Sequence, residues 1–170
     1  MGQSESFHWL SPLGIGVGLF LAWGAFNVVI GVLAPVLLRA ASDAVPSLLV
    51  ISPRADAVVF GADPERILKE QTAVPLVQRL LWQWFAGVLI AFGAATIAIT
   101  WFALRRGEAW ALVVLAIAAV ATLASAGLVL ETYVRRGAPL GLGDIPPLFT
   151  TAAILTPPAF VLSWIGLVQR

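Results

Sequence analysis

The sequence predicts an all-α integral membrane protein, an antiparallel bundle of four transmembrane helices forming a single domain over residues 1–170. Composition is the first ground, because 60% of the residues are hydrophobic and only 11% are charged, whereas soluble domains have about 25% charged residues. The second ground is charge spacing. Four long stretches carry no charged residue, at 10–38, 80–104, 109–130 and 145–169. Each is long enough for a spanning helix, which needs about 20 apolar residues.

The four predicted helices cover approximately residues 11–38, 80–104, 109–130 and 146–168. Tryptophan and tyrosine favour the membrane interfaces. The ones that fall near these helix ends are Trp9, Trp82, Trp84, Trp101, Trp110, Tyr133 and Trp164, and only Trp23 lies in mid-span. A soluble bundle is disfavoured because helices that are apolar on all sides are typical of lipid contact. A β-barrel is disfavoured because its strands would alternate between apolar and polar residues.

The connection over residues 39–79 is predicted to be a structured extramembrane segment between the first two helices. The stretch "SLLVISPRADAVVFG", residues 47–61, predicts a short hairpin around a proline-containing turn. The stretch "DPERILKEQ", residues 63–71, predicts a short helix that Asp63 caps and Pro64 begins. Glu65 and Lys69 are spaced to pair on it. The second long helix is expected to start ahead of the bilayer, near Thr72 and Pro75.

Charged residues near the other helix ends have structural interpretations. Glu131 and Arg135 are one turn apart and predict an ion pair at the end of the third helix. Arg135 and Arg136 are candidates for binding a lipid headgroup, as interfacial basic residues often do. Asp144 is expected to cap the fourth helix ahead of Pro146 and Pro147.

The search for catalytic chemistry is negative, and we predict that the protein is not an enzyme. His8 is the only histidine, there is no cysteine, and no charged residue lies within a span. We therefore expect no catalytic residues, no metal and no cofactor. The net charge of +1 provides no basic surface for nucleic acid.

An unusual polar set lies within the spans. Pro157 and Pro158 deprive the carbonyls of Ala153 and Ile154 of their helical donors, which is costly in hydrocarbon. At about 1.5 Å per residue, Asn27 and Thr122 lie at a similar depth to those carbonyls. We hypothesise that Asn27 donates to a freed carbonyl, with Thr122 nearby.

This contact has two interpretations, which the sequence leaves open. The first is a polar contact that holds helices together at a proline kink. The second is a cavity for a lipid, quinone or other apolar ligand. Its candidate residues are Trp23, Asn27, Thr122, Pro157 and Pro158. Small residues that would let helices approach closely lie on three helices, at Gly24 and Gly31, at Gly87, Ala91 and Ala95, and at Ala118 and Ala126.

Three functional classes follow from these features. The leading one is a non-enzymatic structural or interaction bundle, whose partners are membrane lipids and another membrane protein or a second copy of itself. The alternative is a binder or carrier of an apolar small molecule, and the third is a lipid-modifying membrane enzyme. Arginine outnumbers lysine nine to one, which indicates a GC-rich bacterial genome and therefore a multi-pass protein of the bacterial cytoplasmic membrane. The counts of positive charge at the two faces conflict, so no orientation is assigned.

Overall fold

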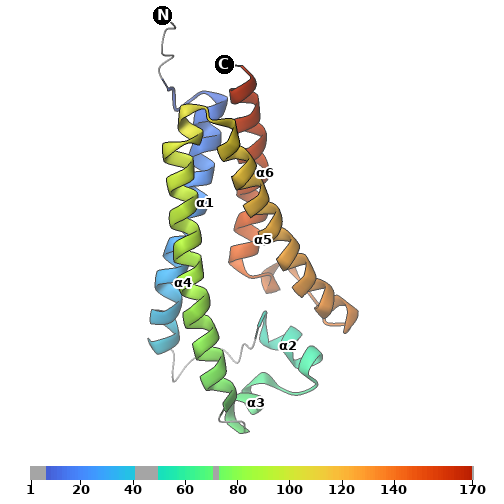
Figure 1. Cartoon of the computed structure of the whole chain (residues 1–170). Coiled ribbons are helices and arrows are strands. Elements are labelled where there is room, and N and C mark those ends of the chain that lie inside the picture. Colours follow the sequence, from blue (N-terminus) through green and yellow to red (C-terminus); the bar gives the residue numbers. More distant parts are fainter. Residues whose placement is uncertain (1–6, 41–49, 71–72, 170) are drawn as a thin grey trace, which may run out of the picture.

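Four long helices make up most of the structure, a computed structural model that describes residues 7–40, 50–70 and 73–169 (Figure 1). They are α1 (Pro12–Ala40), α4 (Ala73–Phe102), α5 (Ala109–Arg135) and α6 (Pro147–Val168). Each contains a stretch long and apolar enough to cross a membrane. Within the described ranges there is no strand. The predicted all-helical class with four candidate spans is therefore confirmed.

The helix ends agree with the sequence at α4 and extend beyond it at α5. α4 begins at Ala73, as expected for a start ahead of the charge-free stretch near Thr72 and Pro75, whereas α5 continues to Arg135, beyond the predicted end at 130. The 30 residues of α4 measure about 45 Å at 1.5 Å per residue. The hydrocarbon core of a bilayer is only about 30 Å thick. α4 is thus longer than a single membrane crossing requires.

α1 packs between α4 and α6, and α5 diverges from α4 toward one end of the molecule. α1 packs most extensively on α4 and next on α6, whereas α5 packs on α6 and barely touches α4. Figure 1 shows α4 and α5 close together at one end and far apart at the other, where α2 and α3 lie. We call this the open end. α1 begins and α6 ends at the opposite end.

Glycines let α1 approach both of its neighbours. A Cβ on Gly24 would lie 3.0 Å from the carbonyl oxygen of Gly93 on α4, and one on Gly16 would collide with Ser163 Oγ on α6. The predicted small face of the first helix is therefore confirmed at Gly24. On α4 the close contacts are made by Ala86 and Gly93. The predicted stripe of Gly87, Ala91 and Ala95 is exposed instead.

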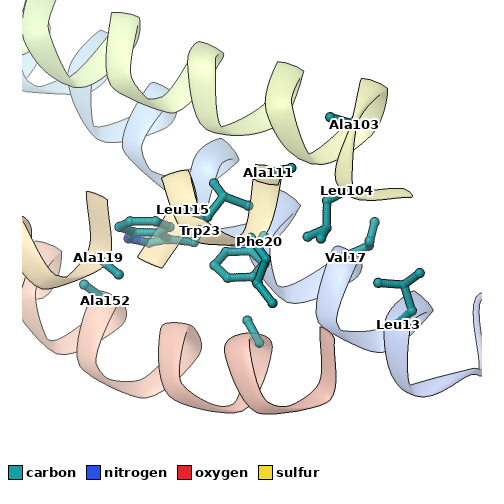
Figure 2. Close-up of a cluster of buried hydrophobic side chains, with 12 residues drawn as sticks. Leu13, Val17, Phe20, Trp23, Ala103, Leu104, Ala111, Leu115, Ala119 and Ala152 are labelled. Atoms are coloured by element: carbon teal, nitrogen blue, oxygen red, sulfur yellow. The ribbon is translucent and has the colours of Figure 1, made fainter. Parts of the chain in front are cut away.

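The main hydrophobic core lies between these helices, nearer the end opposite α2 (Figure 2). α1 contributes four large side chains to this core, and each is at most 1% exposed. They are Leu13, Val17, Phe20 and Trp23. They are spaced three or four residues apart and therefore share one face of α1. This face fixes α1 as the central helix of the assembly.

The connection contains two short helices rather than a hairpin and a helix. α2 (Pro53–Phe60) occupies the region predicted as two strands, so that prediction is wrong for the described residues 50–61; residues 47–49 lie outside the described ranges. The physical reason is local, since the Ser52 side chain accepts a hydrogen bond from Ala55 N–H and Pro53 suits the first helical turn. Gly61 ends α2 in the left-handed region, at φ 69°.

The second short helix, α3 (Pro64–Glu70), confirms its prediction. The Asp63 carboxylate accepts from Glu65 N–H at 3.1 Å. Lys69 Nζ lies 2.6 Å from Glu65 Oε1, and this exposed pair lowers the pKa of Glu65 and raises that of Lys69. α3 is thus a capped helix with paired charges on its exposed side.

The two remaining connections are tight turns. The 3₁₀ turn η1 (Leu104–Arg106) is followed by Gly107, whose φ is 84°, and leads into α5. The turn η2 (Leu142–Asp144) precedes α6. Asp144 does not cap α6 as predicted, because its carboxylate accepts from Gly141 N–H at 2.8 Å, and α6 starts at Pro147 behind Pro146. The predicted pair of Glu131 and Arg135 is confirmed at 2.6 Å.

Candidate functional site

An apolar cavity of about 440 Å³ lies at the open end, where α4 and α5 separate. It is bounded by α1, α4, α5, the start of α6 and the backbone preceding α2. Its size falls within the range of small-molecule sites, about 300–1,000 Å³. The lining residues are Ile30, Val50, Ile51, Leu81, Trp82, Trp84, Phe85, Leu89, Val129, Pro146, Pro147, Leu148 and Phe149.

α4 supplies the aromatic wall of this cavity. Leu81, Phe85 and Leu89 recur at intervals of four residues and therefore share one face of the helix. Trp82 packs edge-on against Phe85, with ring centroids 6.0 Å apart. Trp84 is 71% exposed, so its indole ring can contact both the cavity and its surroundings. The α4 wall is consequently rigid and apolar at its centre and accessible at its edge.

A buried carboxylate holds the opposite wall in place. Asp56 of α2 is fully buried, and its oxygens accept from Val50 N–H at 2.9 Å, Ile51 N–H at 3.2 Å and the Tyr133 hydroxyl at 2.6 Å. A buried charge is tolerated when such donors compensate it. Tyr133 belongs to α5 and is 3% exposed. Asp56 therefore attaches α2 to α5 and fixes the two cavity-lining residues that precede α2.

A second attachment joins α2 to the turn before α6. The Ser52 hydroxyl caps α2 and also helps to lower the pKa of the Asp144 carboxylate. The Gly141 N–H, the Ser52 hydroxyl and the nearby Arg54 guanidinium, in that order of effect, hold the pKa of Asp144 below its ordinary value. Because Pro146 and Pro147 line the cavity just beyond this turn, α2 also positions the α6 side of the site.

The residues predicted for a polar ligand site lie elsewhere. Asn27 is buried, but its side-chain amide donates to the Trp23 carbonyl of its own helix at 2.8 Å. The hypothesised hydrogen bond to Ala153 or Ile154 of α6 is not formed, because a carbonyl one turn away is a nearer acceptor. Trp23 is fully buried and packs edge-on against Phe92, at 5.2 Å between ring centroids. Its indole N–H has no acceptor among the described residues.

The other predicted site residues lie on α5 and α6. The Thr122 hydroxyl donates to the Ala118 carbonyl within α5 at 2.9 Å. Pro157 and Pro158 are exposed, and α6 continues as one helix through both. None of these three residues, nor Trp23 or Asn27, lines the cavity described above. Of the two headgroup candidates, Arg135 is paired with Glu131, while Arg136 follows the last turn of α5 and is exposed.

Sequence reasoning missed Asp56, Tyr133 and the aromatic wall of the cavity. Two signals were available in the sequence, namely the only tyrosine of the chain and a carboxylate within the otherwise apolar run "ADAVVF". Neither signal identifies its partner, because the two residues are 77 positions apart in the chain. For the cavity wall, the sequence predicts only that Trp82 and Trp84 lie near a membrane interface. That prediction gives their depth in the membrane and does not say which residues they contact.

The chemistry that this site offers is apolar contact. None of the lining residues is ionisable. Within the described ranges, no group of three or more histidine, cysteine, aspartate or glutamate side chains could hold a metal ion. The buried carboxylate of Asp56 does not line the cavity, and it holds in place the backbone of the wall behind it. The site is therefore suited to hydrocarbon or an aromatic ring system.

The fold defines a broad class, that of chains with four helices long and apolar enough to cross a membrane, which indicates a multi-pass membrane protein. Comparisons with known proteins find no matching family model, no matching curated protein and no matching solved structure. The function is accordingly argued from the geometry of the cavity.

Proposed function

We propose that this protein binds an apolar molecule of the membrane, a lipid chain or a quinone, in the cavity at the open end. In this proposal the four long helices form an antiparallel bundle across a bacterial cytoplasmic membrane. The observation that supports it is the cavity itself, a partly open hollow of about 440 Å³ lined by apolar and aromatic side chains from four helices. This is the binding alternative of the three functional classes, and it involves no catalytic step.

Physical chemistry favours a filled cavity over an empty one. Side chains that face a void lose dispersion contacts, and a cavity lined only by apolar groups does not retain water. A hydrocarbon chain from the surrounding bilayer restores those contacts without burying a polar group.

Native mass spectrometry of the protein released from its own membranes tests this proposal. We expect a reproducible added mass of a few hundred daltons, which is the size of a lipid or quinone. The Phe85→Trp variant should lose most of the added mass, because the larger ring occupies the cavity. The matched control is Phe102→Trp on the same helix, where the side chain is 60% exposed and away from the cavity. Equal adducts in both variants would contradict the proposal.

A second candidate function, self-association or binding of another membrane protein, is favoured by the outer face of α4. Gly87, Ala91 and Ala95 are exposed at intervals of four residues, the spacing that lets two helices approach closely in a membrane. The same mass measurement reports it as a multimer or a second chain. Ala91→Leu should convert such a multimer to the monomer, whereas a wild-type monomer mass argues against this candidate.

A further inference from the structure

A second apolar hollow continues the cavity away from the helix core. It is an open groove of about 610 Å³ between α3 and the N-terminal part of α4. Phe60 and Ile67 form one side, and Val74, Val77 and Leu81 form the other. Leu81 also lines the cavity. The two hollows therefore meet at one side chain.

We propose that the cavity and this groove form one apolar track that holds a single long-chain amphiphile, whose chain passes Leu81. The inference rests on the proposed function and names its ligand class, an acyl or isoprenoid chain in place of a compact ring. One end of the chain lies among Phe85, Leu89 and Val129, and the other lies beneath α3.

The helical register of α4 makes the track continuous. Val74, Val77, Leu81, Phe85 and Leu89 follow at intervals of three or four residues, so they form one stripe along α4. From Val74 to Leu89 the stripe measures about 22 Å at 1.5 Å per residue. One leaflet of a bilayer core is about 15 Å deep. The track thus accommodates a chain longer than a leaflet.

Exposure and size favour a chain over a protein partner. Along the groove, Phe60 is 48% exposed, Val77 53% and Leu81 58%, so the described residues leave this apolar surface largely uncovered. An α-helix about 10 Å wide occupies about 400 Å³ per turn. The cavity of about 440 Å³ and the groove of about 610 Å³ would together hold only about two to three such turns. A hydrocarbon chain, by contrast, fits both hollows at once.

The lack of cysteine in the sequence makes site-specific labelling direct. Bimane is attached to three single-cysteine variants, Val77→Cys in the groove, Phe85→Cys in the cavity and Val120→Cys as the control. Val120 is 66% exposed on α5 and lines neither hollow. Each protein is placed in phosphatidylcholine nanodiscs with stearic acid that carries a quenching spin label near its carboxyl end or near its methyl end.

We expect both track positions to be quenched more than Val120, with the order of the two stearic acids reversed between Val77 and Phe85. Those positions are about 12 Å apart along α4, so one bound chain presents opposite ends to them. Quenching at Phe85 with only the control level at Val77, or the same order at both, would overturn the inference and leave the proposed function standing. Control-level quenching at Phe85 would overturn both. Leu148→Cys on α6 repeats the cavity measurement if Phe85→Cys does not fold.

Discussion

At the scale of single residues, the position of α2 depends on Asp56. Its buried carboxylate accepts hydrogen bonds from the backbone that precedes α2 and from Tyr133 on α5. Hydrogen bonds to a charged group contribute about 1.5–3 kcal/mol, and a buried charge that loses a donor is costly. This one side chain therefore links a short helix to a long one and shapes the cavity wall.

Tyr133→Phe should loosen α2 without unfolding the long helices. Losing the hydroxyl donor should destabilise the docked state of α2 by about 1.5–3 kcal/mol, equivalent to roughly 10- to 150-fold faster amide exchange in α2. Hydrogen–deuterium exchange of residues 53–60 measures this effect. Thr132→Val is the matched control, because that neighbouring hydroxyl is exposed and bonds only within α5. Equal exchange in both variants would argue against the role assigned to Tyr133.

Asp144 gives the attachment of α2 a dependence on pH. Its pKa is lowered in the folded protein by the Gly141 N–H, the Ser52 hydroxyl and Arg54. The stabilisation is complete above the ordinary carboxyl pKa of about 3.9 and is lost as the pH falls through the lower folded value. Amide exchange of α2 should accelerate in that acid range in the wild type. The acceleration should be smaller in Asp144→Asn, and an identical pH profile would contradict this account.

At the scale of elements, the contact between α1 and α4 depends on glycines, which have no side chain to keep the two helices apart. Gly24 and Gly93 face each other, and a Cβ on Gly93 would lie 2.5 Å from the Gly24 carbonyl oxygen and 2.9 Å from Val28 N. These neighbours are backbone atoms, which cannot move aside as the end of a side chain can. The two helices are consequently held at a separation that only glycine permits.

Gly93→Ala should lower the free energy of unfolding by about 1–3 kcal/mol, the usual cost of overpacking a close contact. Gly87→Ala is the control, since the space around its Cβ position is open and alanine favours a helix. Thermal unfolding of the two variants in the same detergent measures the difference. Equal melting temperatures would show that α1 and α4 separate at little cost.

The elements also show how far the sequence predicts the fold. Charge-free stretches locate all four long helices, because membrane crossing requires continuous apolar residues. The Asp63–Pro64 signature correctly predicts α3, and the equivalent Ser52–Pro53 signature would have predicted α2 had it been weighed above the apolar runs around it. The cavity could not be predicted, since it depends on how far α4 and α5 diverge. The same holds for Asn27. Its depth in the membrane matches that of the freed α6 carbonyls, but an equal depth does not determine which carbonyl accepts its hydrogen bond.

At the scale of the whole molecule, stability and ligand occupancy should be linked. A ligand that binds only the folded state adds about 2.7 kcal/mol at a hundredfold excess over its Kd. Extensive delipidation should therefore lower the melting temperature, and returning native lipid extract should restore it. The restoration should be smaller in Phe85→Trp than in Phe102→Trp. Full restoration in both variants would place the stabilising lipid outside the cavity.

The pairing of the long helices has a consequence for how the chain enters its membrane. α1 has its largest contact with α4, the next long helix to be synthesised, whereas α5 packs chiefly on α6, the last. The first pair can associate as soon as α4 leaves the ribosome. α5 must then wait in the insertion machinery or in lipid until α6 emerges to join it to α1. α6 is thus the helix that joins α5 to α1, and chains that end prematurely before Pro147 would present an unpartnered α5 to membrane quality control.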